Sequence, residues 1–209
     1  MDKTLIDSGR KLEADVANAM QRIGISITPE EAATKNWYEL ANSYGISEEN
    51  FNRSFKQRKS WEESLRDGEA PLFPETYETL DRLQSEGVQL GLLTRSNEEY
   101  TRAKINHFGL QRYFGDRVAI TDVKAESKFQ EALQLIRQLG PTNLRRAYFI
   151  GDKAEDVKVS QPVETMLFVP SKGLYVNRDG LTIPEEVATY RVISSLSEIP
   201  EIIRGENER

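Results

Sequence analysis

The stretch Ala147-Tyr148-Phe149-Ile150-Gly151-Asp152-Lys153-Ala154-Glu155-Asp156 decides the fold class of this chain. Its first four residues form a short apolar run, typical of a buried strand, which ends at Gly151-Asp152. Asp156 follows Asp152 by four residues, so the two carboxylates share one face of a helical turn. Neighbouring carboxylates repel each other unless a cation neutralises them, and oxygen ligands suit Mg²⁺. The stretch therefore predicts a buried strand that delivers two carboxylates at its carboxyl end.

Helical and extended segments alternate on both sides of this stretch. Further strands are predicted at residues 88–94, 118–121, 165–169 and 192–193, with helices at 74–87, 97–109 and 128–139. Strands that alternate with helices indicate an α/β fold, in which a parallel sheet carries helices on both faces. In such sheets ligands bind at the carboxyl ends of the strands.

Polar residues follow two of the other predicted strands. Thr94 ends one strand and is followed by Arg95, Ser96 and Asn97, and Lys124 follows the next. A hydroxyl, a lysine and backbone amides beside a metal suit phosphoryl transfer, because the transferring group spreads negative charge over its oxygens. The strand ends therefore predict a phosphate-handling site.

The part of the chain from Ser8 to Asp67 shows only helical patterns. Thr28-Pro29-Glu30-Glu31 is a capping box with proline at the first helical position, and it predicts a helix that continues to Gly45. A third helix is predicted to open at Ser47. The change of character at Pro71 separates this helical stretch from the alternating pattern that follows.

The composition excludes several classes of site. The 209 residues include no cysteine and one histidine, so disulfides, zinc-thiolate sites and cysteine nucleophiles are excluded. The net charge of −6 gives no bulk attraction for nucleic acid. The sequence has no apolar run of about 18 residues and no signal-peptide pattern at its start. We therefore expect a cytoplasmic protein that binds neither nucleic acid nor membranes.

The joint order of these features resembles the haloacid dehalogenase superfamily. Leu92-Leu93-Thr94-Arg95-Ser96-Asn97 is similar to the second motif of that family, and Phe149 to Asp156 is similar to the fourth. The resemblance covers essentially the whole chain. It implies a Rossmann-like α/β core formed by residues 1–7 and 72–209. It also implies a small helical cap, residues 8–71, inserted after the first motif.

The first motif is where the sequence departs from the family. Asp2-Lys3-Thr4-Leu5-Ile6-Asp7-Ser8 aligns with the second half of the Asp-x-Asp-x-Thr motif. The nucleophilic aspartate would then precede Met1, together with the apolar first strand that lies in the middle of the family's sheet. We expect the natural protein to start upstream of Met1. The alternative is a truncated product that is inactive or needs a partner strand.

The resemblance implies catalytic roles for three residues. Asp2 is the general acid and base, Thr94 binds the phosphoryl oxygens, and Lys124 neutralises charge beside the nucleophile. Lys124 is preferred because it precedes the predicted helix cap at Ser127; the family's prolines are absent there, and Lys128 is the alternative.

The resemblance also implies a magnesium-dependent reaction through an aspartyl-phosphate. Mg²⁺ would be held by Asp2, Asp152 and Asp156, and the phosphate-binding residues would be Thr4, Arg95, Ser96 and Asn97. The expected substrate is a small phosphorylated metabolite, such as a phosphoglycolate-like compound or a sugar phosphate. The expected assembly is a monomer or a homodimer.

Two other functions compete with this one. The chain could be a catalytically inactive phosphate- or metal-binding protein, or a regulatory protein of the same fold. It could also be a phosphotransferase or dehalogenase variant. Dehalogenation is less favoured, because Lys3-Thr4 and the pair Asp152 and Asp156 resemble the metal-dependent branch.

Overall fold

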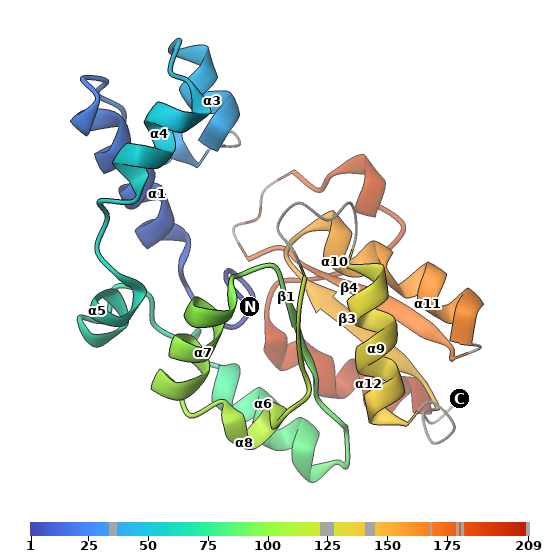
Figure 1. Ribbon diagram of the computed structural model, residues 1–209. Helices are drawn as coiled ribbons and strands as arrows, with labels where there is room; N and C mark the ends of the chain where they lie inside the picture. The colour runs from blue at the N-terminus through green and yellow to red at the C-terminus, as the bar shows by residue number, and fades with distance from the viewer. Residues whose placement is uncertain are drawn as a thin grey trace. The chain divides into compact units, whose positions relative to one another are not determined.

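The computed structural model describes residues 1–33, 37–121, 128–140, 145–167, 169–178, 180 and 182–207. The chain divides into two compact units, drawn in Figure 1. Met1, Lys3–Leu5 and Leu72–Arg209 form what we call the α/β unit, and Asp2 with Ile6–Pro71 forms the helical unit. None of the helices in the described ranges is long and apolar enough to cross a membrane.

The described part of the helical unit contains α1 (Gly9–Arg22), α2 (Pro29–Ala32), α3 (Trp37–Ser43), α4 (Glu48–Phe55) and α5 (Trp61–Arg66). Its core is a cluster of buried apolar side chains from four of these helices, among them Met20, Leu40 and Phe51. Side-chain caps at Thr28, Ser47 and Ser60 begin three of these helices.

The capping box predicted at Thr28 is confirmed. The Thr28 hydroxyl accepts a hydrogen bond of 3.2 Å from the Glu31 N–H, and the Glu31 carboxylate accepts one of 2.7 Å from the Thr28 N–H. The single helix predicted from Thr28 to Gly45 was wrong, since α2 ends at Ala32 and α3 begins at Trp37.

The described part of the α/β unit contains two parallel sheets. One pairs β1 (Leu92–Thr94) with β2 (Val118–Ile120), and the other has the order β3 (Ala147–Gly151), β4 (Ser171–Val176), β5 (Arg191–Ile193). All the described pairings are parallel. The predicted α/β class with parallel strands is confirmed.

Helices and 3₁₀ turns connect the strands: α6 (Thr76–Ser85), α7 (Glu98–His107), α8 (Gln111–Phe114), α9 (Phe129–Leu139), α10 (Ala154–Lys158), α11 (Ser160–Leu167), η2 (Glu185–Val187), η3 (Leu196–Glu198) and α12 (Ile199–Asn207). Helix α9 packs against β1 and β2, α11 packs against β3 and β4, and α6 packs against α12 (Figure 1).

The strand predicted at residues 165–169 was wrong. Residues up to Leu167 belong to α11, whose Val163 is buried in an apolar cluster with Leu133 and Ile136 of α9. A short apolar run fits a buried strand or a buried helix equally well, and here tertiary packing selected the helix. The strand itself is β4, which begins at Ser171.

β4 contains Gly173, which explains why its sequence does not resemble a strand. A Cβ at Gly173 would lie 2.6 Å from the Tyr190 ring and 2.7 Å from Cβ of Val157. A glycine in a strand marks such a close approach of neighbouring groups. Gly173 thus lets α10 and the turn before β5 pack directly on β4.

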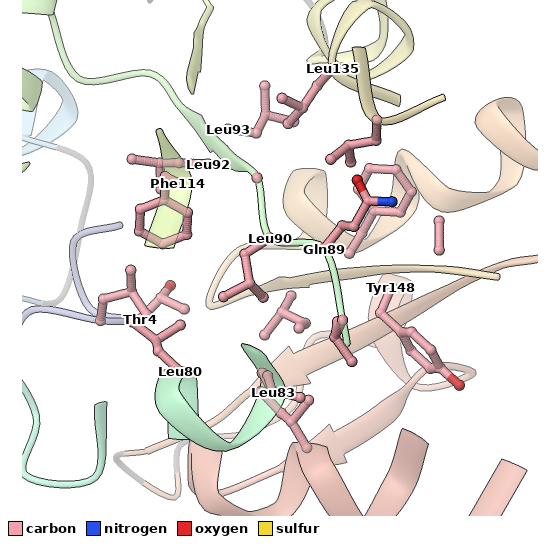
Figure 2. A pocket seen from close by; sticks show the side chains of 18 of the residues that line it. Thr4, Leu80, Leu83, Gln89, Leu90, Leu92, Leu93, Phe114, Leu135 and Tyr148 are labelled. Atoms are coloured by element: carbon pink, nitrogen blue, oxygen red, sulfur yellow. The ribbon is translucent and has the colours of Figure 1, made fainter. Parts of the chain in front are cut away.

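An apolar cavity of about 230 Å³ lies within the α/β unit. Its walls come from β1 and the residues before it, from β3, from α9, and from α6 with α12. Figure 2 shows Leu135 of α9 on one side of the segment that leads into β1, and Leu80 and Leu83 of α6 on the other side.

Replacing Gly173 with alanine should destabilise the protein by about 1–3 kcal/mol, because the added methyl group overpacks a closed contact. Gly205→Ala is the matched control, since a Cβ at Gly205 in α12 meets nothing within 4 Å. Replacing a helical glycine with alanine should stabilise the protein by up to about 1 kcal/mol. Urea unfolding of both variants measures their free energies of unfolding. Equal changes in the two variants would contradict the close contact at Gly173.

Candidate active site

The carboxyl end of β3 carries the first of the two predicted carboxylates. Asp152 follows β3 directly, and its Oδ1 accepts a hydrogen bond of 2.9 Å from the Thr4 hydroxyl. Thr4 is buried and Asp152 is half-buried. Burial raises the pKa of the Asp152 carboxyl above its usual value, and the negative charge of Asp156 raises this pKa further. The site therefore concentrates negative charge where water has limited access.

Asp156 lies one helical turn later, in α10. Its Oδ1 forms an ion pair with the Lys128 amine, and its Oδ2 accepts a hydrogen bond of 3.1 Å from the Lys153 N–H. A Cβ at Gly151 would lie only 2.3–2.5 Å from atoms of the Asp156 side chain. Glycine at this position therefore lets the carboxylate pack against the end of β3.

Among the described residues, Lys128 is a lysine that reaches this site. Its side chain is buried, and its amine also lies 3.7 Å from the Glu155 carboxylate. Lys128 occupies the N-cap position of α9, so the beginning of that helix delivers the charge. Lys124, the lysine preferred from the sequence, lies outside the described residues, and its role stays a prediction.

An ion pair joins the segment after β1 to the helix after β3. The Arg95 guanidinium lies 2.5 Å from the Glu155 carboxylate, and about a quarter of each side chain is exposed. Arg95 was predicted at the site, but Glu155 was missed. An acidic residue in the first turn of a helix is usually explained by the helix dipole, so the sequence carried no separate signal for it.

Thr94, Ser96 and Asn97 occupy the turn between β1 and α7. Thr94 is buried, and its hydroxyl accepts a hydrogen bond of 3.1 Å from the Ser96 N–H. The Asn97 side chain accepts a hydrogen bond of 2.9 Å from the Tyr100 N–H and so caps α7. Asn97 thus shapes the turn, and its predicted contact with phosphate is not needed to explain its presence.

The beginning of the chain forms a tight turn. The Leu5 N–H donates to the Met1 carbonyl at 2.9 Å, and the Leu5 carbonyl accepts a hydrogen bond of 3.0 Å from the Thr76 hydroxyl. Lys3 has a φ of 55°, an uncommon conformation for a side chain other than glycine. Asp2 is half-buried and belongs to the helical unit, so its role as general acid and base stays a prediction.

Arg178 holds this turn in place, although no pattern in the sequence pointed to it. Its Nη2 donates to the Thr4 carbonyl at 3.0 Å, and its Nη1 donates to the Glu75 carboxylate at 2.6 Å. Its guanidinium also stacks on the Phe73 ring, 3.6 Å from the ring centroid. Arg178 is separated from Thr4 by 174 positions, so only the folded chain brings them together.

The residues around Asp152 fit a magnesium ion whose coordination is completed by substrate. Across the described ranges, no group of three or more acidic or histidine side chains could hold a metal alone. Mg²⁺ usually takes one or two protein carboxylates together with waters and substrate phosphate oxygens. The half-buried Asp152 matches that need, and Asp156 already engages both of its oxygens.

A family model described as haloacid dehalogenase-like hydrolase matches residues 1–168 of the chain. The pyrophosphatase PpaX of Oceanobacillus iheyensis is 21% identical over 77% of this chain and 76% of its own length. The tyrosine-protein kinase PtkA of Mycobacterium tuberculosis is 27% identical, and the phosphoglycolate phosphatase of Escherichia coli 23%. These two matches cover 75% and 66% of this chain, but only 55% and 54% of the relatives.

Solved structures show the same fold. A phosphatase from Thermococcus onnurineus superposes with a TM-score of 0.66 at 26% identity, covering 98% of this chain and 95% of that one. A predicted phosphoglycolate phosphatase from Haemophilus somnus gives a TM-score of 0.71 at 15% identity, with coverage of 95% and 93%.

Replacing Asp152 with asparagine should stabilise the metal-free protein near neutral pH. A raised pKa means that the folded state binds more protons than the unfolded state, so stability falls as pH rises toward the raised pKa. Asparagine does not titrate, so the variant avoids this loss of stability. Its side-chain oxygen can still accept the hydrogen bond from Thr4.

Magnesium should reverse the order of stability of the wild type and the Asp152→Asn variant. At about 100 times its Kd, Mg²⁺ should stabilise the wild type by about 2.7 kcal/mol and leave the asparagine variant unchanged. Thermal unfolding with and without Mg²⁺ measures this difference. Equal stabilisation of both proteins would place the metal elsewhere.

Proposed function

Because the chain belongs to the haloacid dehalogenase-like hydrolase family, we propose that it is a magnesium-dependent phosphatase of small phosphorylated metabolites. The observation that supports this most is the cluster at the ends of β1 and β3. There a buried lysine, a half-buried carboxylate and two hydroxyl groups lie on elements that are far apart in the sequence.

Each residue of the cluster has a separate role in phosphate transfer. The Thr94 hydroxyl and the backbone amide of Arg95 bind phosphoryl oxygens, and the Ser96 N–H holds the Thr94 hydroxyl in place. Lys128 neutralises the charge that builds up on those oxygens, and Asp156 holds its amine in place. Mg²⁺, when bound at Asp152, supplies further positive charge beside the phosphoryl group.

Proton transfer falls to Asp2 in this proposal. Its carboxyl group protonates the departing alcohol oxygen and then takes a proton from the water that releases phosphate. The nucleophile is an aspartate at the position before Met1, whose carboxylate oxygen forms a bond to phosphorus as the bond to the alcohol oxygen breaks. The helical unit acts as a cap that excludes water and selects the substrate.

The names of the relatives support the substrate class. The pyrophosphatase and the phosphoglycolate phosphatase both carry a phosphate compound in their names. The chain spans little more than half of the latter protein, so the particular metabolite is not carried over. A non-catalytic phosphate-binding protein of the same fold is the competing proposal.

The proposal is tested with a chain extended before Met1 by an apolar strand that ends in aspartate. This chain should hydrolyse p-nitrophenyl phosphate and at least one metabolite phosphate when Mg²⁺ is present, and Asp152→Ala should abolish the activity. A folded extended chain that is inactive on a broad panel of phosphate esters would favour the non-catalytic protein.

A matched pair of variants in the extended chain distinguishes the catalytic roles of Lys128 and Lys124. Lys128→Met should lower kcat/KM by about 100-fold, equivalent to about 2.7 kcal/mol of transition-state stabilisation. Lys124→Met removes the same charge from the same segment and should change it by less than about threefold. The reverse order would restore the role first predicted for Lys124.

A further inference from the structure

We infer that Arg178, anchored by Glu75, is a positioning residue for the metal site. It fixes the backbone carbonyl of Thr4, and the Thr4 hydroxyl then orients the carboxylate of Asp152. The inference rests on the proposed function for the assignment of Mg²⁺ to Asp152. All four residues belong to the α/β unit.

The Glu75 carboxylate is held by groups at the carboxyl ends of two strands. Its Oε1 accepts a hydrogen bond of 2.6 Å from Arg178, which follows β4, and one of 3.0 Å from the Ser195 hydroxyl, which follows β5. The Leu196 N–H donates to the same oxygen at 3.4 Å. Hydrogen bonds to an ionised group are stronger than those between neutral groups. Glu75 is therefore a fixed anchor for the arginine.

The two terminal nitrogens of Arg178 bind different partners. Nη1 donates to Glu75, and Nη2 donates to the Thr4 carbonyl at 3.0 Å. Only 13% of the Arg178 side chain is exposed, and its guanidinium lies on the Phe73 ring. A guanidinium presents its donors in a rigid planar fork. Placing one nitrogen at Glu75 therefore also sets the position of the nitrogen that holds Thr4.

Thr4 connects this fork to the carboxylate at the end of β3. Its carbonyl accepts from Arg178, while its hydroxyl donates to Oδ1 of Asp152 at 2.9 Å. Because both groups belong to one residue, a carbonyl held in place also limits where the hydroxyl can lie. A hydrogen bond to one oxygen of a metal-binding carboxylate orients the group, and such partners typically contribute about 10–100-fold in metal affinity.

Stability alone does not account for an arginine at position 178. Its Nε is buried and has no hydrogen-bond partner among the described residues. A buried donor without a partner costs free energy, and so does the removal of a charged group from water. Features that break such rules are expected at functional sites. A role in positioning Thr4 explains why a side chain with these costs occupies this place.

The turn that contains Thr4 has other contacts that keep it folded. The Leu5 carbonyl accepts hydrogen bonds of 3.0 Å from the Phe73 N–H and from the Thr76 hydroxyl. Glu75 would keep its donors from the turn after β5. A methionine in place of Arg178 can still pack on the Phe73 ring. Arg178→Met should therefore remove the fork and leave the protein folded, which urea unfolding checks.

The experiment measures the affinity of the chain for Mg²⁺ by competition with Mn²⁺, which is followed by electron paramagnetic resonance. Arg178→Met and Thr4→Val should each weaken Mg²⁺ binding by about tenfold. Arg146→Met is the matched control, because Arg146 forms an ion pair with Glu206 at the opposite end of β3 from Asp152. The control should keep the wild-type affinity, and an equal loss in Arg146→Met and Arg178→Met would overturn the inference.

A double-mutant cycle tests whether Arg178 acts through Thr4. If it does, the double variant should bind Mg²⁺ at most about twofold more weakly than Thr4→Val alone, because both changes remove the same orienting contact. Losses that multiply to about 100-fold would mean independent effects and would overturn the inference. Arg178→Lys keeps the charge but not the fork, so it should also weaken binding. Wild-type affinity in either variant of Arg178 would refute the positioning role.

The measurements separate this inference from the proposed function. A wild type that binds no Mg²⁺, or whose binding survives Asp152→Asn, would refute the magnesium site and the role of Arg178 together. Binding that is lost in Asp152→Asn but unchanged in Arg178→Met would refute the positioning role alone and leave the proposed function standing.

Discussion

The apolar cavity between β1 and β3 is the constraint on which the α/β unit depends. Its volume is about 230 Å³, and its lining is mainly apolar. Apolar side chains that face an unfilled space lose packing contacts on that side. Because no described hydrogen-bonded strand pair links the two sheets, their relative position depends on helix contacts, such as those of α9 with α11 and of α6 with α12, and on the ion pairs at the site. Arg95 after β1 reaches Glu155 after β3, and this contact spans the gap.

Carboxylates outnumber cationic side chains among the residues described at the site. Two cations, Arg95 and Lys128, face Glu155 and Asp156 in ion pairs, and Asp152 adds a further negative charge beside them. The pKa of Asp152 is raised because burial and Asp156 both disfavour its charged form. A divalent cation would reverse that balance, and the phosphate of a substrate would then neutralise the added charge.

The parts of the site that follow strands could be predicted from the sequence. Thr94 and Asp152 were predicted because apolar runs end directly before them, and parallel strands gather such residues at one edge. Lys128 was only an alternative, because Lys124 was preferred as the lysine that precedes the helix cap predicted at Ser127. β4 was missed because Gly173 makes its sequence resemble a turn. Arg178 could not be predicted, because its contact with Thr4 is created by the tertiary fold alone.

The cavity and the site are built from the same structural elements. Elements whose residues line the cavity also carry residues of the site. β1 leads to Thr94, β3 leads to Asp152, and α9 has Lys128 at its first turn and Leu135 in the cavity wall. Catalytic geometry is sensitive to displacements of about 1 Å. The packing of this core therefore sets the relative positions of Thr94, Asp152 and Lys128.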